Sequence, residues 1–126
     1  MNPHLNLAGR VLLSVIFIVS GFGKLAGAAG FSGYLASLGF PAPLVMADLV
    51  GAFELLGGLA ILAGVQVRAV AIALALFCVA TGVLAHLGEQ SALLKNIALA
   101  GGFLVLAGSG AGALAVDKAK RESRYA

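Results

Sequence analysis

Four apolar stretches of about twenty residues each fill most of the chain and decide what it can fold into. They cover approximately residues 7–26, 44–64, 69–87 and 97–116. An α-helix rises about 1.5 Å per residue, so roughly 20 apolar residues cross the hydrocarbon core of a bilayer. Membrane-spanning strands would instead appear as alternating segments of about ten residues, which this sequence lacks. The chain is therefore predicted to be an all-α integral membrane protein, a bundle of four transmembrane helices forming one domain over residues 1–126.

Composition agrees with lipid as the main solvent. The chain is 61% hydrophobic and 10% charged, whereas soluble domains carry about 25% charged residues. The formal charge of +3 does not describe a basic binding face, because four of the eight Lys and Arg residues lie in the tail at residues 117–126. These numbers exclude an ordinary soluble domain and a nucleic-acid-binding protein, and they make the lipid bilayer the first expected partner.

The distribution of basic residues predicts the orientation. With four spans, the N-terminus, the second loop and the tail share one side, and that side collects Arg10, Arg68 and the four basic residues of the tail. The other side has only Lys24 and Lys95. The positive-inside rule therefore places both termini in the cytoplasm and interprets Arg10 and Arg68 as topology determinants. The tail is expected to be a solvated helical extension near anionic headgroups.

The first outer loop, residues 27–43, has no charged residue. Its apolar side chains recur at helical spacing, at Phe31, Tyr34, Leu35 and Leu38. This pattern predicts a short amphipathic helix that is either interfacial or re-entrant, ended by Gly39 and followed by Pro41 and Pro43. Anchoring of aromatic side chains at the interface and a lid over a ligand both fit this helix.

Small residues recur four apart along the apolar stretches, as in Gly23 and Gly27, Ala47 and Gly51, and Gly108 and Gly112. Helices in lipid associate mainly through close backbone approach at such positions. We therefore expect a tightly packed bundle and a face available for a homo-oligomer.

Polar residues within the apolar stretches form one group. Glu54 lies near the middle of the second span, whereas Lys24, His86, Lys95 and Asn96 lie at helix ends on the outer side. A lone charge in hydrocarbon is costly, so Glu54 is expected to pair with a cation, preferably Lys24, or to stay protonated. Structural alternatives remain: the lysines reach the headgroups, His86 bonds to backbone, and Glu54 only locks the bundle.

Several chemistries are excluded by residue type. The single cysteine, Cys78, cannot form an intrachain disulfide or a redox pair within this chain. His4 and His86 belong to opposite sides, so neither a haem nor a metal site is predicted. Motifs for phosphate binding and for nucleophilic hydrolysis are also missing, and the chain therefore contains no autonomous catalytic motif.

Short motifs occur in the order Gly9-Arg10, Ser20-Gly21-Phe22-Gly23-Lys24-Leu25, Tyr34-Leu35, Gly39-Phe40-Pro41-Ala42-Pro43, Glu54-Leu55-Leu56-Gly57-Gly58, Arg68-Ala69, His86 and Leu94-Lys95-Asn96-Ile97-Ala98-Leu99. In this order and spacing the chain resembles the DoxX family of small bacterial four-helix membrane proteins, over about residues 7–117. The resemblance implies the bacterial inner membrane. Its relatives include the membrane subunit of thiosulfate:quinone oxidoreductase and proteins of other membrane redox complexes.

The resemblance also implies a site. It makes Lys24, Glu54, His86, Lys95 and Asn96 candidates for binding a quinone headgroup or a small anion, with Glu54 and His86 as candidate proton-handling groups. The chain would then work with bound quinone or a redox partner subunit, as the membrane subunit of an oxidoreductase. Two other functions stay open: a scaffold or assembly factor, and a proton-linked transporter that would have to oligomerise because it has four spans and no inverted repeat.

Overall fold

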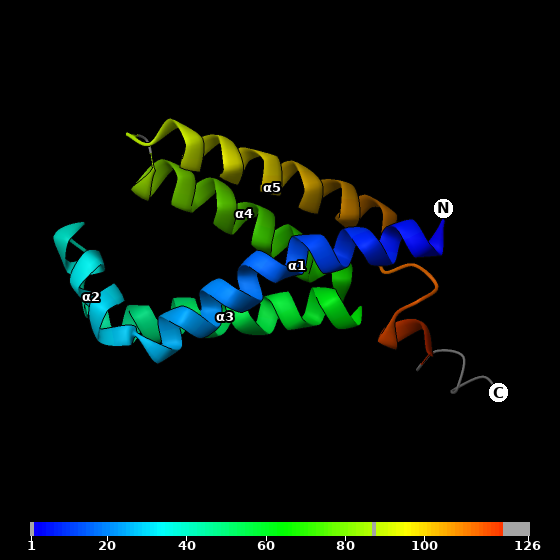
Figure 1. Ribbon diagram of the computed structural model, residues 1–126, viewed down its shortest axis with the longest axis horizontal. Coiled ribbons are helices and arrows are strands. Elements are labelled where there is room, and N and C mark those ends of the chain that lie inside the picture. Colours follow the sequence, from blue (N-terminus) through cyan, green and yellow to red (C-terminus); the bar gives the residue numbers. More distant parts are fainter. Residues whose placement is uncertain (1, 87, 120–126) are drawn as a thin grey trace.

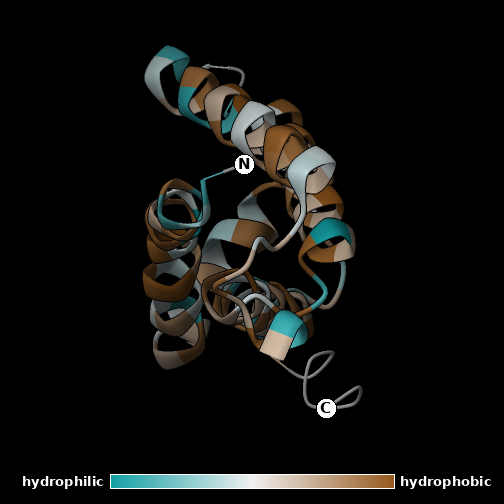
Figure 2. Cartoon of the chain, turned by 90° about the vertical axis from the view of Figure 1, so that its right-hand side faces the viewer, coloured by the Kyte–Doolittle hydropathy of each residue, from teal (hydrophilic) through white to brown (hydrophobic). Residues whose placement is uncertain are grey.

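The computed structural model describes residues 2–86 and 88–119. Its helices are α1 (Pro3–Ala26), α2 (Ala28–Ser37), α3 (Pro43–Ala63), α4 (Val67–Ala85) and α5 (Gln90–Ser109). All except α2 are long and apolar enough to cross a membrane, and hydrophobic colouring covers most of each helix in Figure 2. The described residues contain no strand. The prediction of an all-α membrane protein with four spanning helices and a short helix in the first loop is confirmed.

Local signals in the sequence set the ends of these helices. The side chain of Asn2 accepts hydrogen bonds from the backbone N–H groups of His4 and Leu5, and Pro3 begins α1. Gly39 follows Leu38, the C-cap residue of α2, and has a φ of +86°. The N–H groups of Gly39 and Phe40 donate to the carbonyls of Ala36 and Leu35, which is the Schellman arrangement. Gly39 thus ends α2 as predicted.

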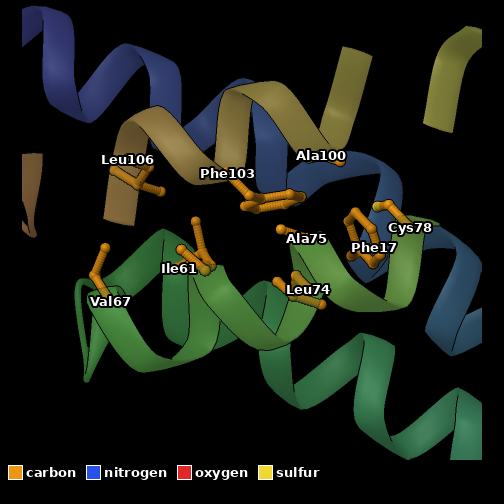
Figure 3. Packing of buried hydrophobic residues seen from close by; sticks show 10 residues of the cluster. Phe17, Ile61, Val67, Leu74, Ala75, Cys78, Ala100, Phe103 and Leu106 are labelled. Atoms are coloured by element: carbon orange, nitrogen blue, oxygen red, sulfur yellow. The ribbon is translucent and has the colours of Figure 1, made fainter. Parts of the chain in front are cut away.

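The spanning helices form two antiparallel pairs (Figure 1). The first helix pair is α1 with α3, and the second helix pair is α4 with α5. The pairs approach one another toward the end that holds the N-terminus and diverge toward the end that holds α2 (Figure 1). Where they meet, Phe17, Ile61, Leu74 and Phe103 are buried in one apolar cluster (Figure 3). This arrangement leaves room between the pairs at the α2 end.

Glycines bring the backbones of the first helix pair together. The buried face of α1 has a heptad spacing and consists of Arg10, Ser14, Phe17 and Gly21. A Cβ on Gly21 would overlap the backbone N of Leu55 and would lie 2.8 Å from the carbonyl O of Gly51. The pairs of small residues predicted from the sequence contribute unequally to helix packing. Gly51 contacts Leu25, whereas a Cβ on Gly23 or Gly108 would have nothing within 4 Å.

The last helix begins at Gln90 and ends at Ser109, rather than covering the predicted residues 97–116. The prediction treated Lys95 and Asn96 as a membrane boundary, but they lie more than one turn inside α5. At the other end, Gly110 and Gly112 have φ values of +81° and +75°, which stop the helix. The following chain turns back and packs against the start of α1.

Arg10 joins three segments at the N-terminal end of the bundle. It is fully buried, at 0% exposure, whereas Arg68 is exposed. Its guanidinium donates to Asn6 Oδ1 at 3.0 Å, to the carbonyls of Ile61 and Leu62 at 3.2 and 3.0 Å, and to the carbonyl of Leu114. Arg10 therefore has a structural role that its interpretation as a topology determinant did not include, because the side chain satisfies carbonyls at the end of α3.

Two sequence predictions extend beyond the described residues. The third span was predicted to end at residue 87, and α4 ends at Ala85. The predicted tail helix begins within the described chain, where residues 116–119 are helical. Residues 87 and 120–126 lie outside the description.

Candidate functional site

A cavity of about 590 Å³ lies between the two helix pairs at the α2 end. We call it the central cavity. All five residues predicted for the site line it, namely Lys24, Glu54, His86, Lys95 and Asn96. Aromatic side chains make up much of the remaining wall, namely Phe17, Phe31, Tyr34, Phe40 and Phe77. The structure thus brings together polar groups from all four spanning helices or their ends in a largely apolar chamber.

Glu54 and Lys24 form an ion pair on the wall made by the first helix pair. Glu54 is 3% exposed, and its Oε1 lies 2.6 Å from Lys24 Nζ. The contact between Gly21 and the backbone of α3 brings the two helices close enough for the Lys24 stem to reach inward. The pairing predicted from the sequence is present, and it neutralises both charges inside the bundle.

The Lys24 ammonium also contacts two other groups. Nζ donates to Ser20 Oγ at 2.9 Å, one turn earlier on α1. The same nitrogen lies 5.1 Å from the centre of the Phe31 ring on α2, a distance at which cation–π attraction operates. Phe31, Tyr34, Leu35 and Leu38 of α2 all line the central cavity. The short helix therefore forms part of its wall.

A second polar pair lies on the wall made by the second helix pair. Asn96 is 6% exposed, and its Nδ2 donates to Thr81 Oγ1 at 2.9 Å. Thr81 in turn donates to the carbonyl of Phe77, also at 2.9 Å. Thr81 was not predicted to belong to the site. The sequence feature that could have indicated it is that Thr81 is the only hydroxyl-bearing residue within α4.

His86 and Lys95 occupy less enclosed positions. His86 follows the last residue of α4, and its Nδ1 lies 3.8 Å from Glu89 Oε2, beyond hydrogen-bonding distance. Among the described residues, this Nδ1 is the only buried side-chain nitrogen or oxygen without a hydrogen-bond partner. Lys95 is exposed while lining the central cavity. Asp48 is also exposed, and it lies outside the cavity.

Aromatic rings and Cys78 mark the part of the cavity nearest the apolar core. Phe77 packs against Phe17 and Phe53, with ring centres 6.2 and 5.2 Å apart. Cys78 also lines the cavity and is 2% exposed. The Lys24–Glu54 pair and the Asn96–Thr81 pair thus belong to facing walls of one cavity.

Comparison with known proteins decides the family. The DoxX family model matches residues 5–87, which include α1 to α4 and the site residues Lys24, Glu54 and His86. The chain belongs to the DoxX family. No solved structure matches it.

Two DoxX-family relatives are similar over most of their length. Inner membrane protein YqjF of Escherichia coli (strain K12) is 39% identical over 117 residues, covering 89% of this chain and 88% of YqjF. Inner membrane protein YphA of the same strain is 32% identical over 127 residues, covering 93% of this chain and 91% of YphA. The chain is a multi-pass membrane protein of this family.

The DoxX-family match ends before α5, which carries Lys95 and Asn96. The central cavity nevertheless includes both residues. A complete polar lining therefore requires the last helix as well as the matched region.

Proposed function

We propose that this DoxX-family protein binds the headgroup of an isoprenoid quinone in its central cavity, as an accessory membrane subunit of a redox complex. One observation carries the proposal: five aromatic side chains and seven polar ones, the five predicted residues with Ser20 and Thr81, line a single cavity between membrane-spanning helices. Its volume of about 590 Å³ is within the range of small-molecule sites, roughly 300–1,000 Å³. An apolar, aromatic wall favours a planar organic ring over a small inorganic anion, which would lose its hydration there.

The chain's own residues would orient the ring and handle protons. Asn96 and Glu54 offer hydrogen-bonding groups from facing walls, and Glu54 and His86 are the groups that would exchange protons with the ligand. Since the sequence supplies no electron carrier, electrons would pass between the bound quinone and a redox partner subunit.

A scaffold function is the second candidate, because the Lys24–Glu54 pair joins α1 to α3 within the first helix pair. In that case the pair would contribute to stability alone. Lys24→Ala would then lower the thermal stability in detergent and leave the affinity for quinone unchanged.

Glu54→Gln is expected to weaken quinone binding about tenfold while the fold is retained. Glutamine has nearly the same size but removes the charge that holds Lys24 Nζ at 2.6 Å. The dissociation constant of decylubiquinol, whose hydroxyl groups can donate to the Glu54 carboxylate, checks the prediction when it is measured by anaerobic thermophoresis in quinone-free lipid nanodiscs. Asp48→Asn is the matched control, because Asp48 is on the same helix but exposed and outside the cavity. Equal affinities for the wild type and Glu54→Gln would favour the scaffold.

We further propose that the protein lies in the inner membrane with both termini in the cytoplasm. Arg10, Arg68 and the basic tail support this orientation. A C-terminal green fluorescent protein fusion should therefore fluoresce, and a C-terminal alkaline phosphatase fusion should be inactive. Active phosphatase with a dark fluorescent fusion would reverse the orientation.

A further inference from the structure

We propose that the central cavity selects the hydroxylated, quinol form of its ligand over the dione form. The inference rests on the proposed function, since it specifies the chemical form of the ring that the cavity binds. It follows from the hydrogen bonds that the polar side chains already make, because those bonds determine which donors and acceptors are left for a ligand.

On the wall made by the second helix pair, Thr81 determines the orientation of the Asn96 amide. Thr81 Oγ1 lies 2.9 Å from the carbonyl O of Phe77, and two oxygens at that distance require a shared hydrogen. The Thr81 hydroxyl must therefore donate to Phe77. Its oxygen can then only accept from Asn96, which turns the amide NH₂ toward Thr81 at 2.9 Å.

The Asn96 carbonyl oxygen, Oδ1, is left for the ligand. No bond from a described residue reaches this oxygen. Oδ1 is also accessible rather than buried. In the described part of the chain, His86 Nδ1 is the only buried side-chain nitrogen or oxygen that has no hydrogen-bond partner. Asn96 lines the central cavity, so Oδ1 presents an acceptor to a bound molecule.

The facing wall also presents an acceptor. The three hydrogens of the Lys24 ammonium have three partners: Ser20 Oγ at 2.9 Å, Glu54 Oε1 at 2.6 Å and the face of the Phe31 ring. Glu54 forms an ion pair with this ammonium, and a carboxylate in an ion pair only accepts. Its second oxygen, Oε2, has no bond from the described residues and is not buried without a partner. The two enclosed groups that remain are thus acceptors on facing walls.

The other polar lining groups discriminate less between the two forms. Lys95 is a donor, but it is exposed, so water already bonds its hydrogens before a ligand arrives. The buried Nδ1 of His86 lies at the end of α4 and can accept or donate depending on its tautomer. The hydroxyl groups of Ser20 and Tyr34 also line the cavity, and each can donate to a dione or accept from a quinol. None of these groups reverses the preference set by Asn96 and Glu54.

A quinol carries two hydroxyl groups on opposite sides of its ring, and each can donate to one wall. A dione would set its carbonyl oxygens against Asn96 Oδ1 and Glu54 Oε2, leaving enclosed acceptors unpaired. An unpaired enclosed polar group weakens binding by about tenfold or more. We therefore expect the dissociation constant of decylubiquinol to be at least about tenfold lower than that of decylubiquinone.

Anaerobic thermophoresis in quinone-free lipid nanodiscs, with decylubiquinol and decylubiquinone titrated separately, tests this selectivity. Thr81→Val keeps the size of the side chain but removes the oxygen that orients Asn96. The amide can then turn its NH₂ toward a dione, so the ratio of the two dissociation constants should fall about tenfold, to the preference set by Glu54 alone. Thr81→Ser retains the hydroxyl and should retain the ratio. A purely structural role for Thr81 would weaken both ligands together and leave the ratio unchanged.

The outcomes separate the inference from the proposed function. Tight binding of both forms with equal affinity, or tighter binding of the dione, overturns the selectivity and leaves quinone binding in place. Binding of neither form overturns both. Asn96→Leu, which removes the acceptor, provides a second measurement if the Thr81 variants do not fold: it should weaken quinol binding about tenfold and dione binding little. Equal weakening of both forms would contradict the inference.

Discussion

Alanine in place of Gly21 is expected to lower the free energy of unfolding by about 3 kcal/mol, near the upper end of the usual cost of overpacking. The added Cβ would overlap the backbone N of Leu55 and would lie 2.8 Å from the Gly51 carbonyl and 2.9 Å from the Leu55 Cα. These atoms belong to the backbone of α3 and cannot rotate away. The first helix pair must therefore separate, which also withdraws Lys24 from Glu54 and disturbs the wall of the central cavity.

Gly23→Ala is the matched control two residues along the same helix. A Cβ at that position would have nothing within 4 Å, and alanine favours helix over glycine by about 1 kcal/mol. The two substitutions should therefore have effects of opposite sign. Thermal unfolding in detergent can be followed by labelling of Cys78, the single cysteine, with a fluorogenic maleimide, because the thiol is 2% exposed in the folded state. Equal transition temperatures for both variants would show that α1 and α3 are not held by this contact.

Arg10→Ala should be similarly destabilising, by about 4 kcal/mol, because it leaves several carbonyl groups without their donor at about 1–3 kcal/mol for each buried one. The substitution removes the donor to Asn6 and to the carbonyls of Ile61, Leu62 and Leu114. It leaves carbonyls at the end of α3 unpaired and detaches the segment that follows α5. The same maleimide assay measures the loss.

Arg10→Lys distinguishes the geometry of the guanidinium from its charge. Lysine keeps the positive charge and hence the expected topology, but a single ammonium cannot serve acceptors on three separate segments. We expect it to recover only a minor part of the lost stability. Arg68→Ala, at an exposed position, should change the transition temperature little. Full stability of Arg10→Lys would mean that charge alone accounts for the role of Arg10.

The presence of the spanning helices can be predicted from the sequence because it depends on local hydropathy. The convergence of the five polar residues can be predicted because it depends on the direction of each span. The chain reverses direction at each span. Lys24, His86, Lys95 and Asn96 therefore lie toward the same end of the bundle, however the helices pack against one another. The heptad spacing of Arg10, Ser14, Phe17 and Gly21 was also present in the sequence. This spacing puts Arg10 on the same helix face as Phe17 and Gly21. It therefore indicates a buried Arg10, whereas the positive-inside rule concerns only its charge.

The contacts between distant segments could not be predicted in this way. The orientation of Asn96 depends on Thr81, fifteen residues away on another helix, and hydropathy does not specify such a bond. The position of α5 depends on Gly110 and Gly112, whose positive φ values turn the chain toward Asn6 and Arg10. Until that turn is known, the apolar residues after Ser109 look like a continuation of the helix.

The ribosome completes the first helix pair before the second, because α1, α2 and α3 precede α4 and α5 in the chain. Both members of the Lys24–Glu54 pair belong to the first helix pair. The glutamate therefore needs no residue of α4 or α5 to become neutralised, and the costly transfer of an isolated carboxylate into hydrocarbon is avoided during membrane insertion. The cavity is completed afterwards, when the second hairpin adds the facing wall with Thr81 and Asn96.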